Sequence, residues 1–132
     1  MTQKGKTPSK GTALIIEDTE DNEVLISALL QHGGYETCWA PTGGVGIEMA
    51  VRVNPDFIIL DIRLPDMDGF EVLRRIRATE AGSDLPVIAM TSYAMAGDRD
   101  RLMRAGCTGY IEKPFDPVRV LDQIHLILDT AR

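Results

Sequence analysis

The chain has 132 residues, of which 44% are apolar, and a formal net charge of −6 from 20 acidic and 14 basic side chains. This length and apolar content suit one domain with its own core and exclude two domains of ordinary size. An acidic chain is poorly suited to neutralising nucleic-acid phosphates across a broad surface, so we expect no direct binding of nucleic acid.

The cysteines and the N-terminal residues bear on the cellular compartment. Cys38 and Cys107 match neither a metal-ligand spacing nor a disulfide framework, which favours a reducing cytoplasm. The apolar run Ala13 to Ile16 is too short for a signal-peptide core or a membrane span. We therefore expect a cytoplasmic protein without membrane insertion, with a flexible tail over residues 1–10 and one domain over residues 11–130.

Short apolar runs alternate with longer amphipathic stretches, a pattern typical of βα units around a parallel sheet. The expected strands are Thr12–Ile16, Glu36–Ala40, the FIIL run that ends at Asp61, Pro86–Thr91 and Gly109–Glu112. The expected helices cover about Glu20–Gln31, Val45–Val53, Phe70–Thr79, Gly97–Ala105 and Pro117–Leu128. Five βα units in one chain predict an α/β fold with a five-stranded parallel sheet.

Apolar spacing also predicts the faces of the first and last helices. The residues at helical spacing in the first helix are Val24, Leu25, Ala28 and Leu29. The residues of the last helix expected to face the core are Val118, Leu121 and Leu128. Val120 or Ile127 would then be exposed, and either a dimer or partner surface or additional core burial accounts for them. His125 is expected to be structural.

Polar residues stand at the carboxyl ends of four expected strands. These residues are Glu17 and Asp18, Asp61, Thr91, and Lys113. Each one alone could simply be the first polar residue after a buried strand. Because the carboxyl ends of parallel strands share one edge of the sheet, where ligands bind in open α/β folds, the set predicts a single site.

The residue types at this edge indicate magnesium-assisted phosphoryl chemistry. Three clustered carboxylates must either raise their pKa values or bind a cation, and an oxygen-only site suits Mg²⁺. Asp61 could then attack a phosphoryl group as a nucleophile, while the ammonium of Lys113 offsets charge on the phosphoryl oxygens. The hydroxyl of Thr91 would donate a hydrogen bond to the product.

Four segments of the sequence resemble the receiver domains of bacterial response regulators. They are LIIEDTEDN, ILDIRLPDMDGFEVLRRIR, IAMTSYAMAGDRDR and AGCTGYIEKPF, and the resemblance extends over about Thr12 to Leu128. The resemblance implies a flavodoxin-like, doubly wound (βα)5 fold with strand order 2-1-3-4-5. It also implies that Glu17 and Asp18 form the acidic pair around Mg²⁺ or Mn²⁺, that Asp61 is the phospho-acceptor, that Thr91 is the switch hydroxyl and that Lys113 binds the phosphate.

Further roles come from the resemblance alone. The backbone carbonyl of Arg63 would complete the metal site, the Lys113–Pro114 peptide would be cis, and Tyr110 would be the rotating aromatic of the switch. Arg63 and Tyr93 follow the acceptor and the switch hydroxyl by two residues. Both are bulky and either shield the phosphate from water, which predicts slow self-dephosphorylation, or are merely solvated.

The implied function is that of a phospho-accepting receiver in a two-component phosphorelay. A histidine kinase or a histidine phosphotransfer protein would supply the phosphoryl group. A downstream protein would then bind the face formed by the fourth helix, the fifth strand and the fifth helix, and a homodimer is an alternative use of that face. Such a protein catalyses its own phosphorylation and slow dephosphorylation but turns over no separate substrate, so we do not expect an enzyme in the ordinary sense.

Other classes of protein agree less well with the residues. An aspartate-nucleophile phosphatase would need an acid where Arg63 stands. A receiver that no longer takes phosphate would not need the acceptor, acidic pair, hydroxyl and lysine together, and a flavin protein would need more aromatic residues near the strand ends. Gly43, Gly44 and Gly46 lack the spacing of a nucleotide-binding loop. The sequence leaves open whether the receiver acts alone or belongs to a hybrid kinase.

Overall fold

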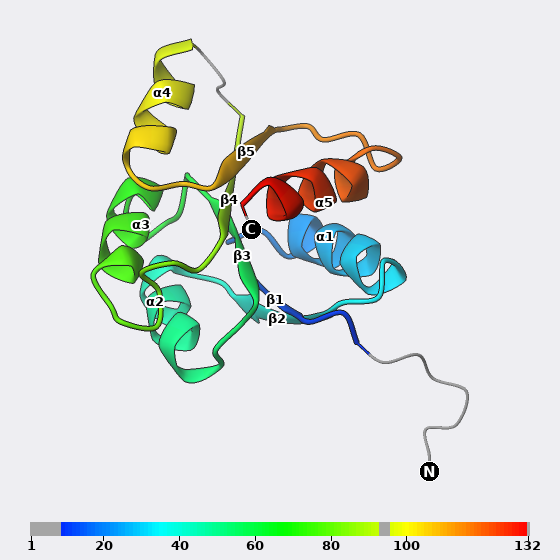
Figure 1. Cartoon of the computed structure of the whole chain (residues 1–132), viewed down its shortest axis with the longest axis horizontal. Coiled ribbons are helices and arrows are strands. Elements are labelled where there is room, and N and C mark those ends of the chain that lie inside the picture. Colours follow the sequence, from blue (N-terminus) through cyan, green and yellow to red (C-terminus); the bar gives the residue numbers. More distant parts are fainter. Residues whose placement is uncertain (1–8, 93–95, 132) are drawn as a thin grey trace.

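The computed structural model describes residues 9–92 and 96–131, in which five strands alternate with five helices (Figure 1). The strands are β1 (Thr12–Ile16), β2 (Glu36–Ala40), β3 (Phe57–Asp61), β4 (Val87–Thr91) and β5 (Gly109–Glu112). The helices are α1 (Glu20–His32), α2 (Gly43–Arg52), α3 (Gly69–Arg77), α4 (Ala96–Arg104) and α5 (Val120–Thr130). Each predicted element is present. Residues 1–8 of the predicted tail lie outside the described residues.

All four strand pairings are parallel, and the sheet order is β2-β1-β3-β4-β5. Helices α1 and α5 cover one face of this sheet, and α2, α3 and α4 cover the other (Figure 1). The chain moves outward from β1 to β2 and then crosses back to β3. The predicted fold class and strand order are therefore confirmed, and the carboxyl ends of β1 and β3 flank the point where the strand order reverses.

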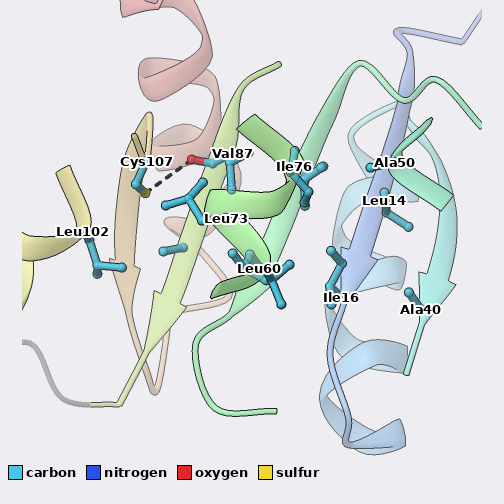
Figure 2. Packing of buried hydrophobic residues seen from close by; sticks show 13 residues of the cluster. Leu14, Ile16, Ala40, Ala50, Leu60, Leu73, Ile76, Val87, Leu102 and Cys107 are labelled. Carbon is cyan, nitrogen blue, oxygen red and sulfur yellow. Dashed lines mark hydrogen bonds between the residues drawn. The ribbon is translucent and has the colours of Figure 1, made fainter. Parts of the chain in front are cut away.

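The core consists of two apolar clusters, one on each side of the sheet. Residues alternate between them along β1, because successive side chains of a strand point to opposite faces. Leu14 and Ile16 pack toward α2 and α3, as Figure 2 shows, whereas Ala13 and Ile15 pack toward α1 and α5. Burial on both faces explains why the central strands are almost continuously apolar.

The predicted faces of two helices need correction. On α1, Val24 and Leu25 are 55% and 43% exposed and Ala28 is exposed too, whereas Leu29 packs against the core beside the buried Ile26 and Leu30. The first turn of the expected last helix, residues 117–119, is a separate turn, so α5 begins only at Val120.

Val118 lies in that turn and is 85% exposed, so its predicted core position is wrong, whereas Leu128 is buried and Leu121 packs against the core as predicted. Val120 is buried and Ile127 packs against the same cluster, so the alternative of additional core burial holds for both. Asp116, where the sequence places a helix cap before Pro117, instead closes this turn, since its Oδ1 accepts a hydrogen bond from the Val118 N–H at 2.9 Å, and the N-cap of α5 is Arg119 without a side-chain capping bond. Among the described residues, no helix has both the length and the apolar character that crossing a bilayer requires.

Candidate functional site

Backbone hydrogen bonds bring the polar strand ends together at one edge of the sheet. The Glu17 N–H donates to the Ala40 carbonyl at 3.1 Å, which extends the β1–β2 pairing by one residue. At the other side, the Lys113 N–H donates to the Thr91 carbonyl at 2.8 Å, which extends the β4–β5 pairing. Asp61 is the last residue of β3, between these two pairs. The fold thus brings the polar residues at these strand ends to one edge of the sheet.

Three carboxylates form the centre of this site. One oxygen each of Glu17, Asp18 and Asp61 lies within 4.8 Å of the other two. Glu17 and Asp61 are buried, at 2% and 6% exposure, and Asp18 is exposed. The Lys113 Nζ lies 3.1 Å from Glu17 Oε1 and 3.5 Å from Asp61 Oδ1. One ammonium among three carboxylates leaves an excess of negative charge on hard oxygen ligands, and this donor set fits a divalent cation such as Mg²⁺.

The environment of Asp61 disfavours its charged form. Burial raises the pKa of this carboxyl from 3.8 to about 6, and the negative charge of Glu17 adds to the effect. The Arg63 N–H, which donates to Asp61 Oδ1 at 3.1 Å, and the Lys113 ammonium lower the pKa but do not cancel the rise. A cation bound beside Asp61 would favour the ionised form.

Several backbone and side-chain contacts hold the loop after β3 in place. The Gly69 N–H donates to the Ile62 carbonyl at 2.8 Å, and Arg63 forms an isolated antiparallel bridge with Asp68. Asp66 reaches across to the start of α2, where its two carboxylate oxygens accept hydrogen bonds from Gly43 N at 2.8 Å and Gly44 N at 2.9 Å.

Sequence reasoning did not identify Asp66, because its partners stand more than twenty residues upstream and no local pattern joins them. These contacts hold the backbone of Arg63 beside the carboxylates. The side chain of Arg63 is exposed.

The predicted switch residues lie on β4 and β5. Thr91 is buried and stands next to a cleft of about 570 Å³ between α3 and α4, lined by Ile62, Arg63, Leu64, Asp68, Phe70, Thr91, Arg101 and Leu102. Tyr110 is partly buried, and the guanidinium of Arg99 on α4 lies 5.2 Å from the centre of its ring. The Lys113–Pro114 peptide is cis, as the resemblance predicted. Tyr93 lies outside the described residues.

Comparison with protein families gives one match that spans most of the chain. Residues 13–125 match the response regulator receiver domain family. A curated relative, the polar-differentiation response regulator DivK of Brucella ovis, is 37% identical over 120 residues, which covers 91% of this chain and 98% of that protein.

Two solved structures show the same fold. The receiver domain of a sensor histidine kinase from Pseudomonas aeruginosa, with a magnesium ion coordinated in its active-site cleft, is 34% identical with a TM-score of 0.82 and covers 90% of this chain and 98% of that one. The chemotaxis response regulator CheY4 of Vibrio cholerae is 26% identical with a TM-score of 0.84 and covers 92% of this chain and 99% of that one. The chain therefore belongs to the response regulator receiver domain family and is a phospho-accepting signalling module of two-component systems, not a substrate-turnover enzyme.

Proposed function

We propose that Asp61 is the phospho-acceptor of this receiver. Its carboxylate oxygen would attack the phosphorus atom of a phosphohistidine, or of a small donor such as acetyl phosphate, and an aspartyl phosphate would form as the bond to the donor atom breaks. The observation that carries the proposal is the burial of Asp61 between two other carboxylates and the Lys113 ammonium. Burial keeps bulk water away from the acyl phosphate that this reaction produces.

The carboxylates of Glu17, Asp18 and Asp61, with the backbone carbonyl of Arg63, would hold Mg²⁺ or Mn²⁺. The bound ion would offset negative charge on the phosphoryl oxygens as Asp61 approaches them. Lys113 supports the same task from within the protein, because its Nζ already lies 3.5 Å from Asp61 Oδ1 and can move to a phosphoryl oxygen. Glu17 keeps Lys113 in place through the ion pair at 3.1 Å.

Thr91 and Tyr110 would transmit the phosphorylation of Asp61. A phosphoryl group on Asp61 offers new acceptors to the Thr91 hydroxyl, and movement of Thr91 would let Tyr110 turn inward. The backbone bond between Lys113 and Thr91 supports this coupling of β4 to β5. The Arg99 guanidinium over the Tyr110 ring links the same change to α4.

The receiver takes its phosphoryl group from a histidine kinase, and we propose that a histidine phosphotransfer protein can also serve as donor. The downstream protein would bind the α4–β5–α5 face. Exposed apolar residues on α4 and α5, Met103 and Leu126, support partner binding or a homodimer there. We further propose that the receiver domain covers residues 11–130 and works in the cytoplasm, where its two free cysteines stay reduced.

Incubation with acetyl phosphate followed by intact mass measurement tests the proposal. We expect a gain of one phosphoryl group that requires Mg²⁺ and is absent from Asp61→Asn. Asp122→Asn changes an exposed carboxylate on α5 and should be phosphorylated like the wild type. Folded protein that gains no phosphoryl group, or an Asp61→Asn variant that gains it equally, would reject the assignment of Asp61.

A further inference from the structure

Trp39 makes a contact with the acidic pair that the proposed reaction does not yet use. It is the one tryptophan in the chain and lies on the edge strand β2, in register with Ile15 of β1. Its indole Nε1–H donates a hydrogen bond to the backbone carbonyl of Glu17, with 2.6 Å between nitrogen and oxygen. A side chain from the edge of the sheet thus reaches the first residue of the β1–α1 connection.

This contact holds the carbonyl group of Glu17 in place. The Glu17 N–H is already held by the Ala40 carbonyl, and the Glu17 side chain is held by the Thr19 N–H at 3.2 Å and by Lys113. The carbonyl that Trp39 binds belongs to the peptide between Glu17 and Asp18. Its orientation sets the direction in which the chain leaves β1, and therefore the position from which the Asp18 carboxylate joins the other two.

Among the three carboxylates, the position of Asp18 depends most on how the backbone beside it is held. Glu17 and Asp61 are buried and packed, whereas Asp18 is exposed and stands in a bend between β1 and α1. Groups that orient a metal ligand without touching the metal commonly change metal affinity when they are removed. The donor that orients the Glu17–Asp18 peptide is the indole of Trp39.

We propose that Trp39 is a positioning residue for the acidic pair, and that its indole N–H senses the occupancy of the cation site. The inference rests on the proposed metal site at Glu17, Asp18 and Asp61. Loss of one hydrogen bond of this kind should weaken Mg²⁺ binding by about 5- to 10-fold. Trp39→Phe removes the donor while it keeps an aromatic ring on the strand.

The experiment is an Mg²⁺ titration followed by NMR on the ¹⁵N-labelled protein. A single tryptophan gives a single indole N–H signal, which we expect to shift with the same apparent Kd as the backbone amides of Asp18 and Asp61. The titration is repeated with Trp39→Phe, in which the backbone amides report binding, and their apparent Kd should rise by about 5- to 10-fold.

Thr37→Val is the matched control, because it also removes a side-chain hydrogen bond from β2, the 2.9 Å contact between Gln31 Nε2 and Thr37 Oγ1, but at a distance from the site. Its Mg²⁺ affinity should equal that of the wild type.

If Trp39→Phe is not folded, the wild-type indole signal still decides the matter. Backbone amides that shift while the indole signal stays fixed would overturn the role of Trp39 and leave the metal site intact. A wild-type protein in which Mg²⁺ shifts no signal would overturn the metal site itself.

Discussion

The residue with the least favourable electrostatic environment in the site is Asp61. It is buried next to a second buried carboxylate, Glu17, and its single cationic neighbour among the described contacts, Lys113, is shared between the two. Ionised Asp61 is therefore costly in the folded protein without a cation, although it is the form that phosphoryl transfer needs. This cost is measurable as a loss of stability.

The first prediction concerns Asp61→Asn in the metal-free protein. Because folding raises the pKa of Asp61 from 3.8 to about 6, its contribution to stability is fully present below pH 3.8 and is lost as the pH rises through about 6. In a chelating buffer at pH 7.5, Asp61→Asn should be more stable than the wild type by about 1–3 kcal/mol. Urea unfolding at pH 7.5 and pH 4 measures the difference, which should shrink at the lower pH. Equal stabilities at pH 7.5 would contradict it.

The polar residues of the site were predictable because each stands directly at a strand end, where the chain pattern places it at the ligand-binding edge. The contacts of Trp39 with the Glu17 backbone and of Asp66 with the backbone at the start of α2 were not predictable in this way. Their bonds join a side chain to a main-chain group on a different element. Sequence carries no periodic signal for such a contact, since only the packing of the two elements brings the atoms within reach.

At the scale of elements, the existence and order of the helices followed from the sequence, but the buried faces of α1 and α5 followed only in part. Residues 24–30 of α1 contain apolar side chains on more than one side, so helical spacing alone allows two stripes. Packing on the sheet selects Ile26 and Leu30. On α5 the error had a different cause, because Val118 belongs to a turn before the helix and follows no helical phase.

The second prediction compares two glycines of α2. A Cβ on Gly46 would lie 2.6 Å from Cδ1 and 2.8 Å from Cγ1 of Ile16, a core residue with no room to move. A Cβ on Gly44 would meet nothing closer than Asp66 Oδ2 at 3.4 Å. Gly46→Ala should therefore cost on the order of 1–3 kcal/mol, despite the better helix propensity of alanine, and Gly44→Ala should be close to neutral. Thermal unfolding of both variants checks this, and a destabilised Gly44→Ala beside an unaffected Gly46→Ala would refute it.

The third prediction concerns Arg77, which joins α3 to two loops. Its guanidinium donates to the carbonyls of Gly82 at 2.7 Å, Gly106 at 2.8 Å and Leu85. Arg77→Ala should destabilise the fold by about 2–4 kcal/mol, because partly buried acceptors lose their donors.

Arg77→Lys should recover little of this loss, since one ammonium cannot reproduce the planar arrangement of donors. Arg75→Ala is the control on the same helix, where an exposed ion pair with Glu71 is lost at a cost below about 1 kcal/mol. Equal effects of Arg77→Ala and Arg75→Ala in chemical denaturation would show that the three carbonyls do not depend on Arg77.

At the scale of the whole molecule, the site exists only in the folded chain. Glu17 and Lys113, which form an ion pair, are 96 residues apart in the sequence. The strand order places their strands on either side of β3 and β4, and every strand contributes its carboxyl end to the same edge. The doubly wound sheet thus accounts for how polar residues at the ends of four strands, far apart in the sequence, come to lie at one edge.

The measurement that tests this account most directly is the location of the phosphoryl group. The protein is incubated with Mg²⁺ and acetyl phosphate and then reduced with borohydride, which converts an aspartyl phosphate to homoserine, and peptide mass spectrometry identifies the converted residue. We predict conversion at Asp61 alone, and none when Mg²⁺ is chelated. Conversion at another carboxylate such as Asp18, or no conversion in folded protein, would contradict the assignment of Asp61 as the acceptor.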